Sequence, residues 1–311
     1  MNILKVTNLC KTYKTGKKAL TDLNFTVEAG EILGFLGPNG AGKSTTINII
    51  STLLKADAGS IVYFNNPDLS NKAIKKRLGI VPQDIALYED ISAYENVKFF
   101  AALYGVKRDV MREKVDSALE KVGLLDRKDD KPETFSGGMK RRLNIACAIA
   151  HEPDLIIFDE PTVGIDPQSR NHILESIKLL RKNGATVIYV THYMEEVQQI
   201  CDRIIIMDGG TVLLNDKLAN ILKTFGGATY QLTLVGTPST KDVQILESMT
   251  GISQAECLGR NDLLLRMTDT FSLNRSLVFL NKHGLALTDI VKQERSLEDV
   301  FLTLTGKRLR D

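Results

Sequence analysis

A glycine-rich segment near the start of the chain has the residues and the spacing of a phosphate-binding loop. Residues 37–44 read GPNGAGKS and fit the pattern G-x-x-x-x-G-K-[ST]. Glycines allow backbone N–H groups to turn toward phosphate oxygens without a clash at Cβ. We expect Lys43 to reach the β- and γ-phosphates of a nucleotide and Ser44 to place its hydroxyl on Mg²⁺. The expected nucleotide contacts in this loop are Gly37, Pro38, Asn39, Gly40, Ala41, Gly42, Lys43, Ser44 and Thr45.

Two adjacent acidic residues follow an apolar run and supply carboxylates for the same chemistry. The run is residues 155–158, and Asp159 and Glu160 come directly after it. A carboxylate at the end of a buried strand helps a phosphate-binding loop to hold its metal, so we expect Asp159 on the Mg²⁺ side, directly or through water. Glu160, on the opposite side of an extended backbone, would orient and deprotonate the attacking water. Together with the loop, the pair predicts hydrolysis of a nucleotide phosphate.

Buried parallel strands must position these groups, and three apolar runs have that character. Residues 31–36, 155–158 and 186–190 are short apolar segments of the kind covered on both faces of a sheet. Helical patterns separate them, and strand, helix, strand repeated in this way predicts a parallel sheet with helices on its faces. Residues 3–6 and 23–27 alternate as half-buried strands do.

Two amphipathic helices are expected between the first and second of the buried strands. Ser92 and Glu95 have the form of a capping box, and Gly105 ends the helix that they begin. A second helix runs from about residue 109 to Gly123. We assign the apolar stripes of both helices to core packing.

The pattern changes after Gly226-Gly227, which we interpret as the boundary between a first domain, 1–225, and a second, 228–311. Beyond the glycines, six segments read strand, helix, strand, strand, helix, strand: residues 230–235, 241–249, 253–258, 263–267, 273–282 and 286–291. This βαββαβ order predicts a small α+β domain that is ferredoxin-like. A last helix has Ser296 and Asp299 in capping positions.

Composition excludes several classes of protein. The 311 residues are 43% hydrophobic and 25% charged, which suits two domains with cores of their own. Forty basic residues against 38 acidic ones leave too small a basic excess for an electrostatic nucleic-acid binder or a polybasic membrane anchor. The basic runs 75–77 and 140–142 read as solvated helix faces.

No segment of the sequence is interpreted as a membrane span or a secretory signal. The apolar runs fall far short of the roughly 20 residues that a spanning helix needs, and no apolar signal region precedes Cys10. The four cysteines form no Cys-x-x-Cys pair, so we expect buried, reduced thiols rather than disulfides or a zinc site. The expected protein is cytoplasmic and binds no nucleic acid.

Further motifs resemble those of ABC transporter ATPases and follow in that family's order. Residues 135–139, FSGGM, resemble the family's signature motif. The other matches are Tyr13 to the aromatic residue that stacks on adenine, Gln83 to the Q-loop, Asp166 to the D-loop and His192 to the switch histidine. The resemblance covers about residues 1–225 and implies a P-loop NTPase fold of the ABC cassette type. Such a cassette is an α/β domain with a mostly parallel core sheet, an antiparallel β subdomain and a helical subdomain.

The resemblance also implies that two copies of the chain assemble head to tail. The signature residues are Ser136, Gly137, Gly138 and Met139. They stand at the start of a predicted helix, whose N-terminus favours anions. In the family this surface faces the γ-phosphate of ATP held by another copy. Because the chain has one cassette, it must dimerise to hydrolyse ATP.

The remaining site residues follow from the same resemblance, with ATP and Mg²⁺ as the expected cofactors. The implied catalytic residues are Glu160, His192, which contacts the γ-phosphate, and Lys43. The implied metal-binding residues are Ser44, Gln83 and Asp159. Tyr13 and Gln83 add to the nucleotide contacts of the loop. Gln83 would also relay ATP occupancy to residues 84–96, which in the family touch a membrane partner.

Departures from the common pattern indicate a subfamily. Phe135 and Met139 stand where most of the family has Leu and Gln, and Asp166 is retained although the residues before it differ mildly from Ser-Gly-Leu. Together with residues 94–96, 103–105 and 296–306, these features resemble the ATPases of drug and antibiotic exporters of the daunorubicin-resistance type. The resemblance implies an exporter subunit that lies on the cytoplasmic face of the membrane through a separate polytopic permease.

Three alternatives remain open from the sequence. A non-transport ABC ATPase acting on ribosomes or DNA would carry tandem cassettes, coiled-coil insertions or zinc insertions, and none of these is read here. An importer is disfavoured only through resemblance. The second domain either stabilises and regulates a dimer or binds a small ligand. The transported substrate is not encoded in a chain whose permease is separate.

Overall fold

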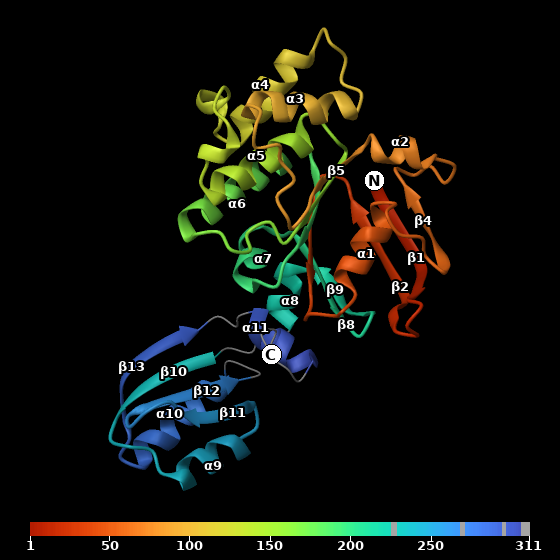
Figure 1. Cartoon of the computed structure of the whole chain (residues 1–311). Coiled ribbons are helices and arrows are strands. Elements are labelled where there is room, and N and C mark those ends of the chain that lie inside the picture. The colour runs from red at the N-terminus through yellow and green to blue at the C-terminus, as the bar shows by residue number, and fades with distance from the viewer. Residues whose placement is uncertain (225–228, 268–270, 294–296, 306–311) are drawn as a thin grey trace. The chain divides into compact units, whose positions relative to one another are not determined.

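The computed structural model of the chain describes residues 1–224, 229–267, 271–293 and 297–305 (Figure 1). It divides into two compact units, one formed by Met1–Leu218 and one that begins at Ala219. The expected boundary at Gly226-Gly227 and the expected capping residue Ser296 lie outside the described residues, as does the side chain of Asp299. Within the described ranges, no helix is both long enough and apolar enough to cross a membrane.

A six-stranded sheet forms the centre of the first unit. Its strands are β3 (Ile32–Leu36), β5 (Leu78–Val81), β6 (Leu155–Asp159), β7 (Thr186–Val190), β8 (Arg203–Asp208) and β9 (Thr211–Lys217). They lie in the order β5-β6-β7-β3-β8-β9, and every pair is parallel except β8 with β9. All residues of β3 and β7 are buried, which confirms the prediction of strands covered on both faces. The short strand β5 was not predicted, because Gly79 interrupts its run of apolar residues.

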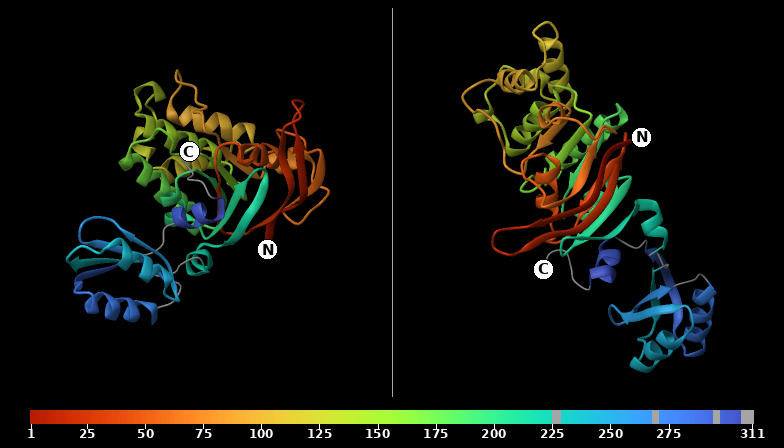
Figure 2. Two further views of the ribbon diagram at one scale, coloured as in Figure 1. Left: turned by 90° about the horizontal axis from the view of Figure 1, so that it is seen from below. Right: turned by 90° about the vertical axis from the view of Figure 1, so that its right-hand side faces the viewer.

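A three-stranded antiparallel sheet lies beside the central one and shares its core (Figure 2). It consists of β1 (Asn2–Thr12), β2 (Lys18–Glu28) and β4 (Ala58–Tyr63), in the order β2-β1-β4. The strands β1 and β2 extend well beyond the predicted ranges 3–6 and 23–27. Phe25 of this sheet meets Phe35 of the central sheet edge to face, with ring centroids 5.1 Å apart. The predicted antiparallel subdomain is therefore packed directly onto the strand that precedes the glycine-rich loop.

Helices complete the first unit. They are α1 (Lys43–Ile50), α2 (Asn71–Lys75), α3 (Ala93–Leu103), α4 (Met111–Lys121), α5 (Gly137–Ile149), α6 (Pro167–Lys182) and α7 (Met194–Ile200), with short 3₁₀ turns at Leu125–Arg127 and Pro132–Thr134. The capping box of Ser92 and Glu95 is present at the start of α3, as predicted. Gly105 and Gly123 have positive φ beyond the ends of α3 and α4, where a left-handed residue ends a helix. The helices α3, α4 and α5 pack together as the helical part of the unit (Figure 1).

The second unit has an antiparallel sheet of its own. After α8 (Leu218–Thr224) come β10 (Thr229–Val235), α9 (Thr240–Ser248), β11 (Ile252–Cys257), β12 (Asp262–Met267), α10 (Phe271–Lys282), β13 (Ala286–Gln293) and α11 (Leu297–Thr305). From β10 to β13 this is the predicted order of strands and helices. The sheet order is β11-β12-β10-β13, and Leu246 of α9 and Leu280 of α10 join Leu232 and Leu263 of the sheet in one core.

The cysteines only partly follow the expectation of buried thiols. Cys147 and Cys201 are buried, whereas Cys10 is half-buried and Cys257 is exposed. Cys257 is the last residue of β11, an edge strand, so nothing in the sheet covers it. All four thiols are free, and no group of three or more His, Cys, Asp or Glu side chains among the described residues could hold a metal.

Candidate nucleotide-binding site

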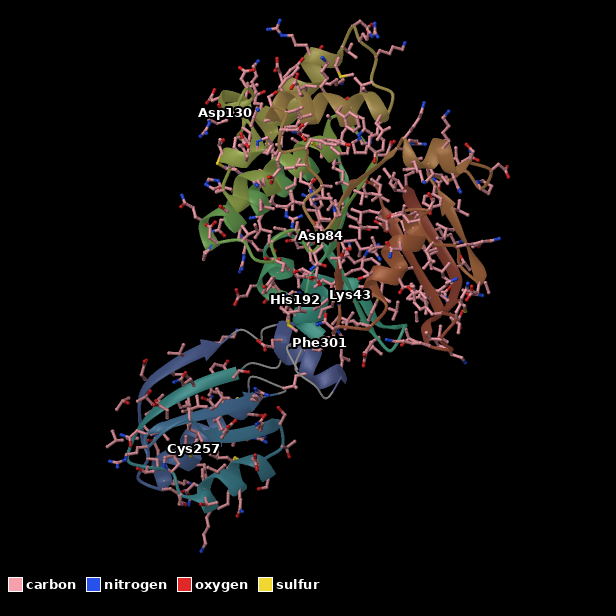
Figure 3. All side chains as sticks on the ribbon, in the orientation of Figure 1. Lys43, Asp84, Asp130, His192, Cys257 and Phe301 are labelled. Atoms are coloured by element: carbon pink, nitrogen blue, oxygen red, sulfur yellow. The ribbon has the colours of Figure 1, made fainter. Side chains whose placement is uncertain are left out.

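The predicted site residues meet at the carboxyl ends of neighbouring parallel strands. β3 pairs with β7, and β7 pairs with β6, so the segments that follow these three strands leave the sheet at one edge. The glycine-rich loop follows β3, Glu160 follows β6 and His192 follows β7. Figure 3 shows Lys43 and His192 at this edge. Three segments far apart in sequence thus form one site.

A polar cavity of about 360 Å³ lies at this edge of the sheet. Its lining residues are Tyr13, Lys17, Ala19, Asn39, Gly40, Gly42, Lys43, Ser44, Thr45, Gln83, Glu160 and His192. Nucleotide-sized ligands occupy clefts of this scale. Most of the residues expected to contact nucleotide therefore face one cavity.

Sequence reasoning missed Lys17 and Ala19 as residues of this cavity. The turn between β1 and β2 brings them there, because the N–H of Tyr13 donates to the carbonyl of Lys17 at 2.9 Å. The closeness of Lys17 to Tyr13 in the sequence was the available signal. Without knowledge of the hairpin formed by β1 and β2, the sequence does not indicate which lysine near Tyr13 lines the cavity.

The glycine-rich loop holds its shape through its glycines and its lysine. Gly42, at the start of α1, has φ of 103°, and a Cβ there would lie 2.7 Å from the carbonyl oxygen of Ala19. The Nζ of Lys43 donates to the carbonyls of Gly37 at 2.7 Å and of Pro38 at 3.1 Å. The ammonium group thus already lies inside the concave loop where phosphate oxygens would bind.

Opposite charges lie close together around Lys43. Burial lowers the pKa of Lys43, while Glu160 and, to a smaller extent, Asp159 raise it. Burial is also the first cause of the raised pKa of Asp159, with Glu160 as the second, and Lys43 opposes both. Two carboxylates therefore share one ammonium group in a partly desolvated place. Such a site suits a hard cation such as Mg²⁺, which binds through one or two carboxylates and completes its shell with phosphate oxygens and water.

Glu160 and His192 lie in contact. Nδ1 of His192 is 3.3 Å from Oε1 of Glu160. The N–H of Glu160 donates to the carbonyl of Val190 at 2.9 Å, which continues the pairing of β6 with β7 by one residue. The expectation of an extended backbone at Glu160 is wrong, because its φ is 49°, in the left-handed region. This turn directs Glu160 into the cavity, whereas Asp159, still in the strand, does not line it.

Tyr13 precedes the glycine-rich loop in the sequence and Gln83 follows it, and both line the cavity. The hydroxyl of Tyr13 is 3.1 Å from Oγ1 of Thr45, which fixes the ring beside α1 while leaving 38% of the residue exposed. An exposed, fixed aromatic ring can stack on a base. Gln83 follows β5, and its own main-chain carbonyl accepts from the guanidinium of Arg141.

The signature residues and Asp166 do not line the cavity. Ser136 caps α5, and its Oγ accepts from the N–H of Met139 at 3.3 Å. Asp166 caps α6 by accepting from the N–H of Ser169 at 2.9 Å, and this bond lowers the pKa of its carboxyl. Gly138 packs directly against Ser169, so the starts of α5 and α6 form one exposed surface. Ser136 and Gly137 are exposed on it.

The basic run 140–142 is not a solvated helix face. Arg141 is 3% exposed, and its guanidinium donates to two backbone carbonyls. Arg142 is half-buried and donates to the carbonyls of Val122 and Gly123. The sequence pattern could not reveal this, because the acceptors are backbone groups of segments distant in the chain. The run 75–77 also departs from the expectation at Arg77, which lies over the ring of Phe64 and pairs with Asp154.

Known proteins resemble the chain over most of its length. The family described as ABC transporter matches residues 20–163. The linearmycin resistance ATP-binding protein LnrL of Bacillus subtilis (strain 168) is 42% identical, over 99% of this chain and 100% of its own length. The daunorubicin/doxorubicin resistance ATP-binding protein DrrA of Streptomyces peucetius is 33% identical, over 97% and 92% of the two chains.

Solved structures resemble about seven tenths of the chain. cbiO1 from Clostridium perfringens, part of the ABC transporter complex cbiONQ, has a TM-score of 0.65 at 34% identity and covers 72% of this chain and 94% of its own. A dimeric ATP-binding cassette in a post-hydrolysis state with ADP and Pi has a TM-score of 0.61 at 31% identity, over 69% and 98% of the two chains. With a relative 42% identical over its whole length, the chain belongs to the ABC transporter family and is one of its ATP-binding ATPases.

Proposed function

We propose that the chain is the ATP-hydrolysing subunit of an exporter. Two copies, arranged head to tail, would bind and hydrolyse ATP and thereby drive transport through a separate membrane protein. The observation that carries the proposal is the division of the site within one chain. The cavity holds most of the groups expected to contact ATP and the attacking water, whereas the residues at the start of α5 do not line it. A second copy would complete the site.

Within one copy, the chain's own residues bind and orient the nucleotide. The amides of the glycine-rich loop and the Nζ of Lys43 would hold the β- and γ-phosphates. Tyr13 would stack on the adenine. Ser44, Asp159 and Gln83 would hold Mg²⁺, which neutralises charge on the phosphates when bound. The electrostatic influence of Asp159 and Glu160 on Lys43 places two carboxylates near the loop, which supports this assignment.

Hydrolysis would use the contact between Glu160 and His192. Glu160 would take a proton from the attacking water as the water's oxygen bonds to the γ-phosphorus and the bond to the β-phosphate oxygen breaks. The products would be ADP and phosphate. His192, 3.3 Å from the Glu160 carboxylate, would orient it and contact the γ-phosphate. The exposed surface of Ser136, Gly137 and Asp166 would close over the ATP of the other copy.

An apolar surface on the helical part is our candidate for the membrane partner. Its members are Ile85, Tyr88, Phe99 and Leu103, which are all exposed. The rings of Tyr88 and Phe99 meet edge to face at 5.1 Å, so these two side chains form a contiguous apolar surface. Leu103 also lines a second cavity of about 490 Å³, whose other lining residues include Leu53, Ile80, Lys72, Lys75 and Lys76. An apolar floor with lysines on its rim suits an amphipathic segment that carries acidic residues.

The class of cargo and the place of action are part of the same proposal. Relatives are named for resistance to linearmycin and daunorubicin/doxorubicin and for Nod factor export. These names support export of antibiotic or lipid-like molecules, and they favour transport over action on ribosomes or DNA. The chain would then work at the cytoplasmic face of the membrane, attached through its permease.

We propose that residues 228–311 form a regulatory or dimer-stabilising domain beside a cassette of residues 1–225. The described part of the second unit closes a hydrophobic core of its own. A packing or regulatory role is favoured over ligand binding, because no constellation of polar residues in this part of the sequence points to a ligand.

The test is co-purification from native membranes with the Glu160→Gln variant, ATP and Mg²⁺. We expect a polytopic membrane protein in stoichiometric amount, and recovery of ribosomes or DNA instead would overturn the proposal. Adding Phe99→Asp should abolish recovery of that protein while ATP binding is kept. Leu179→Asp is the matched control, because Leu179 is as exposed as Phe99 but lies on α6. If both variants lose the membrane protein equally, the apolar surface is not the site that binds it.

A further inference from the structure

A buried arginine lies between the two halves of the proposed ATP site. Arg141 is on α5, one and a half turns after Ser136, and only 3% of the residue is exposed. Fully buried arginines are rare, because removing the charge from water is costly unless donors are satisfied. The partners of this guanidinium therefore indicate what it does.

Arg141 holds two consecutive carbonyls of the segment that follows β5. Nη1 donates to the carbonyl oxygen of Pro82 at 2.6 Å, and Nη2 donates to that of Gln83. A planar fork that binds two adjacent acceptors fixes both the position and the rotation of the segment, which a single hydrogen bond cannot do. Gln83 is also one of the residues that line the nucleotide cavity. Arg141 thus sets the backbone from which Gln83 reaches the nucleotide.

The rest of this segment is also tied to helices. Glu89 pairs with Lys140, the neighbour of Arg141 on α5. Asn96, fully buried at the start of α3, accepts from the N–H of Tyr88 and donates to its carbonyl, both at 2.9 Å. Residues 82–92 are therefore attached to the helices α3 and α5. The strand that precedes them, β5, is paired with β6 of the central sheet.

We propose that Arg141 is a positioning residue that couples the two ATP sites of a dimer. It fastens the Gln83 segment of one site to the helix whose first residues, Ser136 to Met139, would close the other site. A shift of Gln83 on nucleotide binding is then transmitted to the signature surface through the side chain of Arg141, beside the Lys140–Glu89 pair, rather than through the sheet. The inference rests on the proposed head-to-tail dimer, and it assigns to Arg141 a role that binding of ATP by a single copy does not require.

Arg142 provides a matched control for the test. It follows Arg141 on the same helix and also donates to two consecutive carbonyls, those of Val122 at 2.9 Å and Gly123 at 3.3 Å. Those acceptors lie at the end of α4, within the helical part. Neither of these two hydrogen bonds of Arg142 involves residues 82–83. Arg141→Gln and Arg142→Gln remove equal charge and an equal number of bonds.

The experiment measures ATP binding, thermal stability and steady-state hydrolysis on the full chain. We expect Arg141→Gln to keep the Kd for ATP within about twofold and to lower kcat by about tenfold or more, since misplacement of site groups by an ångström has effects of this size. Arg142→Gln should lower thermal stability similarly and keep kcat within about twofold. Arg141→Lys, which keeps the charge without the fork, should restore only part of kcat. Equal kcat in the two glutamine variants would overturn the inference.

A double-variant cycle tests whether Arg141 acts through Gln83. If it does, Gln83→Ala combined with Arg141→Gln should have the kcat of Gln83→Ala alone. Losses that multiply would overturn the inference, because Arg141 would then act by another route. Failure of the proposed function would be recognised by a different result. If the Glu160→Gln chain forms no dimer with ATP, the proposed head-to-tail arrangement is wrong, whatever the Arg141 variants do.

Discussion

At the scale of single residues, the unusual backbone of Glu160 is what brings the catalytic pair together. A left-handed conformation at a non-glycine residue costs of the order of 1–3 kcal/mol and persists where the surroundings enforce it. Here the bond from the Glu160 N–H to Val190 enforces it and aligns the residue with β7, from which His192 follows. The carboxylate consequently reaches the imidazole at 3.3 Å instead of continuing the strand.

Glu160→Gln should retain ATP binding and lose hydrolysis. Glutamine keeps the size and the hydrogen bond toward His192 but cannot accept a proton from water, and loss of a general base typically lowers rates by 10²–10⁴-fold. The variant should accumulate an ATP-bound dimer, measurable by light scattering with and without ATP. Hydrolysis at the wild-type rate would exclude Glu160 as the base.

Asp159→Asn should stabilise the nucleotide-free chain at neutral pH while abolishing Mg²⁺-dependent hydrolysis. Burial, and next Glu160, raise the pKa of Asp159 above its ordinary value of 3.8. The folded chain therefore binds this proton more tightly than the unfolded chain, and the contribution of Asp159 to the free energy of unfolding falls as pH rises through that ordinary value. Thermal unfolding at pH 7 should show a higher Tm for the variant, and the difference should shrink as pH falls toward 4. A lower Tm at pH 7 would contradict this account.

At the scale of elements, the packing of α5 against α6 joins the signature surface to Asp166. The contact is close because Gly138 carries no side chain and Ser169 of α6 occupies the space beside it. Asp166 caps α6 at the same place. Two helix starts with exposed amides are thus held side by side, an arrangement suited to anions supplied by a second copy.

Gly138→Ala should destabilise the chain by about 1–3 kcal/mol, the usual cost of overpacking. An added Cβ would overlap both Cβ and Oγ of Ser169. Gly137→Ala is the control, because the nearest atom to its Cβ is 4.0 Å away. Chemical denaturation should separate the two variants. Adding Ser169→Gly should recover stability in Gly138→Ala, and failure to do so would show that the destabilisation has another origin.

At the scale of the whole molecule, the chain consists of two units that each close a hydrophobic core. The central sheet of the first unit ends with β9 at Lys217, before the second unit begins. Strands β10 to β13 pair only with one another. Stability of the cassette should therefore not depend on the second sheet.

A chain truncated after residue 225 should fold and bind ATP. Every strand of both sheets of the first unit is retained, so circular dichroism should show a cooperative transition and a fluorescent ATP analogue should bind with near-normal affinity. Truncation after residue 200 is the contrasting variant, because it removes β8 from its pairing with β3 and deletes β9. That shorter chain should be insoluble, and insolubility of the 1–225 chain would count against the proposed boundary.

The sequence by itself determined the parts whose signals are local. A buried strand, a glycine pattern and a helix in succession are enough to predict a phosphate-binding loop, and the capping box of Ser92 and the order of elements from β10 to β13 follow from short-range patterns in the same way. The motifs resembling ABC transporter ATPases indicated the family before any geometry was known, and the full-length relatives confirm it.

Only the tertiary structure decided which segments meet. Burial patterns identify strands but not their neighbours, so the adjacency of β6, β7 and β3 was not readable from them. The family resemblance implied that Glu160, His192 and the loop act on one ATP, and the structure shows how the strand order joins them in one cavity. The left-handed turn at Glu160 and the burial of Arg141 were missed for a related reason. Each depends on a hydrogen bond to a backbone carbonyl distant in the chain, and such an acceptor leaves no mark on the identity of its residue.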